Sequence, residues 1–151
     1  MRENVRVRYR WTDAWLLAAI ALASRNKAAQ LWQIIASGDD LNHTIFTPEE
    51  IESGLVRLTR EGWITECAGQ FSTTDLFKRE NLKIRNWDSV RKIEKLLDAE
   101  PRNENELMPH PANNLKYPGI TSEVLNGALK VYEKNARVEL NRLLGKSKDA
   151  K

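Results

Sequence analysis

An alternation of apolar and polar residues with a period of two runs through residues 2–11 and predicts a strand. Its wet face carries three arginines: Arg6, Arg8 and Arg10. Thr12 is a suitable N-cap for a helix that we expect to continue to about Ser24. Apolar residues surround this helix, which predicts a central position in the core: Trp15, Leu16, Leu17, Ile20 and Leu22. The N-terminal part of the chain therefore predicts a basic strand followed by a core helix.

Two more helices are predicted by aliphatic residues at helical spacing. The second spans about 28–42, and Gly38 is expected to weaken it locally. The third has the clearest start, because Thr47 can cap it, Pro48 suits its first turn and carboxylates follow at the positive end of the helix dipole. Gly62 ends the third helix. The inward residues of the two helices are Leu31, Ile34, Ile35, Leu41, Ile51, Leu55 and Leu58.

A hairpin follows, with strands predicted at 63–66 and 70–73 and Cys67 in the turn. Apolar residues from Leu76 to Leu97 then keep helical spacing, either as one long helix or as two with a break at Asn86. Residues 100–119 contain four of the five prolines and predict a long connection.

The last helix is predicted to begin at Thr121 and to end at Gly145. One apolar stripe follows it: Leu125, Leu129, Tyr132, Ala136, Leu140 and Leu143. The pattern as a whole predicts an α+β, mainly helical protein. We expect one domain at 1–75, a helical extension at 76–144 and a flexible tail at 145–151.

Length and composition suit a globular protein. The chain has 151 residues, of which 41% are hydrophobic and 30% charged. Its single cysteine excludes an intrachain disulfide and favours a reducing, cytoplasmic location. The apolar stretch 14–23 after four arginines resembles a signal peptide, but Glu3 and Asp13 interrupt that pattern, so we expect a buried helix. The stretch is shorter than the roughly 20 apolar residues that a bilayer requires, so no membrane partner is expected.

Three helices and a short hairpin between residues 12 and 73 resemble the winged helix-turn-helix family. The segment Thr47–Ile64 (TPEEIESGLVRLTREGWI) is similar to that family's third helix running into the first wing strand. The basic N-terminal strand and the helices beyond the hairpin are also similar to a PadR-like layout, in which such helices form a dimer. The resemblance covers less than half of the chain. It implies a DNA-associated transcription regulator that pairs as a homodimer through its C-terminal helices.

The distribution of charge bears on DNA as a partner. Residues 28–75, which contain the resembling motif, carry two basic and eight acidic residues. DNA binding depends on neutralising phosphates, so the basic candidates are few: Arg6, Arg8, Arg10, Arg57 and Arg60. Residues after the hairpin could compensate: Lys78, Arg79, Lys83 and Arg85. Because basic residues are scarce in the motif itself, a second function stays open, in which the module binds another protein through Glu49, Glu50 and Glu52.

The sequence contains no recognisable pattern of catalytic or metal-binding residues. The two histidines, His43 and His110, and the single cysteine do not form a cluster with metal-ligand spacing. Phosphate loops and nucleophile motifs are absent from the sequence. The five tryptophans are expected in or beside the core. We therefore expect no enzyme activity, no cofactor and no catalytic or metal-ligating residue.

Overall fold

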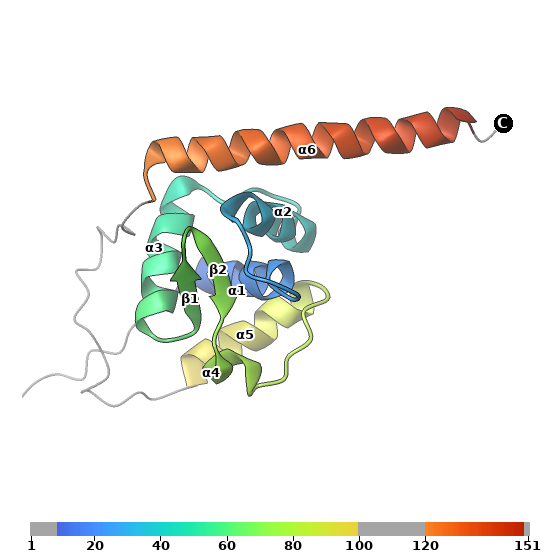
Figure 1. The fold of residues 1–151 in the computed structure, drawn as a ribbon. Coiled ribbons are helices and arrows are strands. Elements are labelled where there is room, and N and C mark those ends of the chain that lie inside the picture. The colour runs from blue at the N-terminus through green and yellow to red at the C-terminus, as the bar shows by residue number, and fades with distance from the viewer. Residues whose placement is uncertain (1–8, 100–119, 150–151) are drawn as a thin grey trace, which may run out of the picture.

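A computed structural model describes residues 9–99 and 120–149 of this chain. Within these ranges the fold is α+β and mainly helical, as predicted (Figure 1). The predicted connection at 100–119 and most of the predicted strand at 2–11 lie outside the described residues. The elements, in order, are α1 (Trp11–Ala23), α2 (Leu31–Asn42), α3 (Pro48–Arg60), β1 (Ile64–Cys67), β2 (Gln70–Thr73), α4 (Asp75–Lys78), α5 (Trp87–Ala99) and α6 (Ser122–Asp149).

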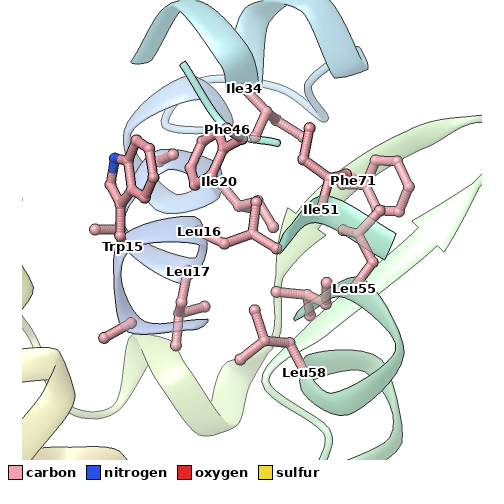
Figure 2. Packing of buried hydrophobic residues seen from close by; sticks show 14 of the residues in the cluster. Trp15, Leu16, Leu17, Ile20, Ile34, Phe46, Ile51, Leu55, Leu58 and Phe71 are labelled. Atoms are coloured by element: carbon pink, nitrogen blue, oxygen red, sulfur yellow. The ribbon is translucent and has the colours of Figure 1, made fainter. Parts of the chain in front are cut away.

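Helix α1 lies at the centre of the core, as its apolar surface predicts. It contacts α2, α3, α5 and β2. Four of its large side chains are at most 1% exposed: Trp15, Leu16, Leu17 and Ile20. Figure 2 shows them among side chains from the neighbouring elements, such as Ile34, Leu55 and Phe71. A helix that is apolar on all sides is stable here because other elements surround it.

The beginning of α1 differs from the prediction. The helix starts at Trp11, so Thr12 lies inside it and is not the N-cap. Asp13 stabilises this end instead, because its Oδ2 accepts a hydrogen bond from the Arg10 amide at 2.8 Å. Trp11, which was expected in or beside the core, is 49% exposed and stacks on Trp15 with ring centroids 5.8 Å apart.

Helices α2 and α3 follow the prediction closely. Their predicted inward residues are all buried: Leu31, Ile34, Ile35, Leu41, Ile51, Leu55 and Leu58. Helix α2 begins a few residues later than expected because the preceding Ala29 pairs with Phe71 of β2 through two backbone hydrogen bonds of 2.7 and 2.8 Å. Helix α3 is capped by Thr47 and ends before Gly62, whose φ of +81° stops it.

The hairpin is confirmed, but its first strand lies one residue later than predicted, so Cys67, which was expected in the turn, ends β1. Strands β1 and β2 pair in antiparallel register from Ile64↔Thr73 to Cys67↔Gln70. Only Ala68 and Gly69 connect the strands, with φ values of +52° and +79°. Two positive φ angles match the right-handed twist of a hairpin.

The region after the hairpin is not one long helix. Helix α4 has a single turn, residues 79–86 are irregular and α5 begins at Trp87. The two-helix alternative is confirmed, but the break extends over residues 79–86. Asn86 marks its end, where the Asn86 Oδ1 accepts a hydrogen bond from the Asp88 amide at 3.1 Å. Helix α5 packs on α1 and contributes three side chains to the same core: Val90, Ile93 and Leu97.

Helix α6 begins as predicted, since the Thr121 hydroxyl caps it by accepting from the Val124 amide at 3.2 Å. It does not end at Gly145, and the first residues of the predicted tail are helical up to Asp149. A glycine stops a helix only where it adopts a left-handed conformation, and Gly145 remains helical. Helix α6 lies across α2 and its C-terminal part projects beyond the body of the protein (Figure 1).

Candidate functional site

The start of α3 carries the three glutamates that were predicted to bind a protein. Glu50 completes a capping box, because its Oε2 accepts from the Thr47 amide at 2.9 Å. Glu49 is well exposed and forms a loose ion pair with Arg10 at 3.4 Å. Glu52 is half-buried. Of the three, Glu50 therefore has a local structural role, and Glu49 presents most of its side chain to solvent.

Arg57 does not lie on the solvated face where a DNA contact would require it. It is 5% exposed, and it forms two hydrogen bonds with the fully buried Asp13: Nε to Oδ2 at 2.7 Å and Nη2 to Oδ1 at 2.8 Å. The Ser53 hydroxyl accepts a third hydrogen bond from Nη2 at 3.1 Å. A guanidinium held in this way is part of the core and cannot reach a phosphate. Arg57 is therefore wrong as a DNA-binding candidate.

Asp13 is the partner that sequence reasoning missed. Its position contained a signal, because one carboxylate stands at the start of an otherwise apolar helix. A buried carboxylate requires a cation or several hydrogen-bond donors. The sequence could not show which cation pairs with it, because Arg57 lies 44 residues away.

Arg10 and Arg60, the other described candidates next to α1 and on α3, are not brought together. Arg10, at the start of α1, lies beside Glu49 at the beginning of α3, whereas the exposed Arg60 is at the other end of α3. Eleven residues separate Glu49 from Arg60, which is about 17 Å at the rise of an α-helix. Arg6 and Arg8 lie outside the described residues. Within the described part of the chain, the predicted DNA contacts therefore do not form a single basic face.

The middle of α3 has no exposed face. Six consecutive residues, Ser53–Leu58, are buried. Because an α-helix completes a turn in 3.6 residues, six consecutive positions cover every direction around its axis. A helix that enters the major groove must present base-reading side chains to solvent. The exposed parts of α3 are restricted to its two ends.

The hairpin is also a poor match to a phosphate-contacting wing. Its turn, residues 67–70, is exposed and contains no basic residue. Glu66 stabilises the turn, because its Oε1 accepts from the Gly69 amide at 2.8 Å. Cys67 is exposed at the tip, as predicted.

Helix α6 carries most of the large apolar side chains that are exposed among the described residues. Leu125 is 1% exposed, and Leu129 and Tyr132 are partly buried against α2 and the core. From residue 133 to residue 144 every side chain is exposed. Among them, Leu140 is 56% and Leu143 is 54% exposed. The predicted stripe is thus covered by the protein's own body at its N-terminal end and bare at its C-terminal end.

Tyr132 marks the last contact between α6 and the body. Its hydroxyl donates a hydrogen bond to the Asp39 carboxylate at the C-terminal end of α2. This hydrogen bond, followed by burial and by the charges of Asp39 and Asp40, raises the pKa of Tyr132 to about 12.

A pH dependence of stability follows from the raised pKa of Tyr132. The folded state favours the protonated form of Tyr132. The contribution of this hydroxyl to the stability of the fold is therefore complete below about pH 10 and is lost as the pH rises towards about 12. We expect Tyr132→Phe to lower the free energy of unfolding by about 1 kcal/mol below pH 10, with solvent screening keeping the effect small. The difference from the wild type should shrink between about pH 10 and 12 in urea titrations. A difference that is constant across this range would contradict the assignment.

Comparisons with models of protein families, with curated proteins and with solved structures gave no match for this chain. Among the described residues, no group of three or more histidines, cysteines or carboxylates could hold a metal ion. No helix in the same part of the chain combines the length and the apolar character needed to cross a bilayer. A function for this protein therefore has to be inferred from the geometry of its own residues.

Proposed function

We propose that this chain is a non-enzymatic interaction module with a winged-helix arrangement, which pairs with a second copy of itself through α6. The observation that carries this proposal is the bare C-terminal half of the α6 stripe. Large apolar side chains exposed in a row are typical of a surface that another molecule covers. The order of helices and hairpin, together with the bridge between Ala29 and Phe71, supports the winged-helix arrangement of the body.

The bare half of the stripe continues the buried half on the same side of α6. At 100° per residue, Leu125, Leu129, Tyr132, Ala136, Leu140 and Leu143 fall within a sector of about 80°. The first three contact the body of their own chain, and the other three extend beyond it. Beyond Tyr132, the side chains of the stripe are therefore not covered by the described part of the chain.

A second copy is the partner that fits this surface. In a two-fold dimer each subunit contributes the same patch, so a stripe of leucines meets another stripe of leucines. Glu133 and Glu139 lie at the two edges of the stripe, and Arg137 and Arg142 lie further around the helix, so acidic and basic side chains of two arms can pair beside the seam. Helix pairs that bury such a seam are a common form of dimerisation.

A DNA-associated regulator, which the resemblance implied first, remains a prediction. It would require α3 to present a basic reading face. The burial of Ser53–Leu58 and the pairing of Arg57 with Asp13 give it no support. The acidic start of α3 favours the interaction module.

Sedimentation equilibrium of the wild type and of Leu140→Lys/Leu143→Lys tests the proposed pairing. At tens of micromolar we expect the wild type to have twice the chain mass of 17.4 kDa. The double variant should sediment as a monomer, because each of the two subunits would have to bury two ammonium groups in the seam. Its circular dichroism should remain unchanged, since both side chains are exposed in the single chain.

Val138→Lys is the matched control. Val138 and Leu140 are exposed to a similar extent, 58% and 56%. Val138 lies about 160° away from Leu140 around the helix axis, on the opposite side from the stripe. We expect this variant to remain a dimer. A monomeric wild type, or equal dissociation by both variants, would refute pairing through the stripe.

A further inference from the structure

A cavity of about 560 Å³ lies on a part of the protein that neither α3 nor α6 lines. The cavity is open to solvent and is lined by the C-terminal end of α1, the end of β2, α4 and the irregular residues 79–86. Its volume is within the range of about 300–1,000 Å³ that is usual for sites of small organic ligands. The cavity therefore has the size of a ligand site.

The charged residues that line the cavity are all basic. Four basic residues line it: Arg25, Lys78, Lys83 and Arg85. None of its lining residues is an aspartate or a glutamate. The scarcity of basic residues at the predicted DNA-binding motif contrasts with their concentration here. Cations that converge on one cavity without carboxylates attract an anion.

The wall formed by residues 79–86 is held in place by specific hydrogen bonds. The buried Ser89 hydroxyl accepts from the Arg85 amide at 2.9 Å and donates to the Lys83 carbonyl at 3.1 Å. Arg25, just after α1, also contacts this wall, because its Nη2 donates to the Ile84 carbonyl at 3.3 Å. These contacts fix the backbone that carries two of the basic side chains. A preformed wall reduces the entropy that a ligand must lose to order the site.

The lining of the cavity also has an apolar part, formed by Ala21, Phe77 and Ile84. A site with an apolar surface and a few converging cations suits an organic molecule with a compact anionic group. Arginine and lysine together favour phosphate, which accepts several charge-assisted hydrogen bonds at once. We propose that this cavity binds a small organic phosphate that carries two or more negative charges.

Titration calorimetry on the full chain tests the proposal with inorganic pyrophosphate and ADP as probes. We expect saturable binding of one molecule of either probe per chain. Lys78→Gln/Lys83→Gln should weaken it about tenfold or more, because each lysine supplies a charge-assisted contact. The matched control is Lys92→Gln/Lys95→Gln, which removes the same charge from exposed positions of α5 outside the cavity. The control should bind as the wild type does.

Lysine acylation read by mass spectrometry provides a second measurement that requires no variant. Pyrophosphate should protect Lys78 and Lys83 from the reagent and leave Lys92 and Lys95 unprotected. A third titration uses a short DNA duplex, which separates a small phosphate from a nucleic-acid backbone. Absence of binding, equal weakening by both double variants, or binding of the duplex alone would each overturn the proposal.

Discussion

Asp13→Ala is expected to lower the free energy of unfolding by about 3–5 kcal/mol, because it leaves the Arg57 guanidinium buried without its counter-charge. Asp13 is fully buried, and its carboxylate accepts two hydrogen bonds from the Arg57 guanidinium at 2.7 and 2.8 Å. The substitution also removes the acceptor for the Arg10 amide at the start of α1. Urea denaturation followed by circular dichroism measures the loss. The urea concentration at the midpoint of unfolding should fall, and the slope of the unfolding free energy against urea concentration should stay the same.

Glu49→Ala is the matched control for this prediction. Glu49 also pairs with a residue at the start of α1, but its pair with Arg10 is exposed and 3.4 Å long. Its loss should cost about 0–1 kcal/mol. Asp13→Ala combined with Arg57→Met should be more stable than Asp13→Ala alone, because no unpaired charge remains in the core. Equal losses from Asp13→Ala and Glu49→Ala would refute the role of the buried pair.

Because Arg57 belongs to this buried ion pair, a charge change at Arg57 cannot be used to test DNA binding. Charge reversal at Arg57 would place two carboxylates together in the core. A loss of DNA binding by such a variant would therefore report unfolding. Arg60, which is exposed at the end of α3, is the position on this helix where a charge change tests a surface contact.

Gly38→Ala is expected to destabilise the protein by about 1–3 kcal/mol through overpacking, although alanine is the better helix former. An added Cβ would lie 2.2 Å from Cε2 of Phe46. The Phe46 ring cannot move away easily, because it is 2% exposed and stacks on Trp15 with centroids 3.7 Å apart. Trp15 is fixed in turn, since its Nε1 donates to the Gly38 carbonyl at 2.9 Å. Thermal and urea unfolding measure the effect.

Gly127→Ala is the control, because nothing lies within 4 Å of the added Cβ at this position of α6. It should stabilise the protein by up to about 1 kcal/mol, which is the ordinary gain in helix propensity. Adding Phe46→Leu to Gly38→Ala should recover part of the loss, since the smaller side chain vacates the space. Stabilisation by Gly38→Ala would show that the close contact with Phe46 does not control this position.

Several elements of this fold could be predicted from the sequence because their signals are local. Thr47, Pro48 and the following carboxylates define the start of α3, because a cap and a helix dipole act within one turn. Gly62 ends that helix and Gly69 suits the hairpin turn, because glycine adopts a positive φ without steric cost. Ala68 also has a positive φ, but alanine does not signal that conformation. The buried faces of α2 and α3 also followed from periodicity, and the central position of α1 followed from the apolar residues all around it.

Which charged and aromatic residues are accessible depends on the packing of the elements against one another. Arg57 lies one turn before Arg60 on the same helix, yet Arg57 is buried against a carboxylate 44 residues distant in the chain, whereas Arg60 is exposed. Trp11 and Trp15 are separated by one turn, and only Trp15 is enclosed. The basic cavity brings Arg25, which follows α1, together with basic residues between 78 and 85. Burial and pairing depend on the side chains that long-range packing brings together, and helical spacing carries no information about those contacts.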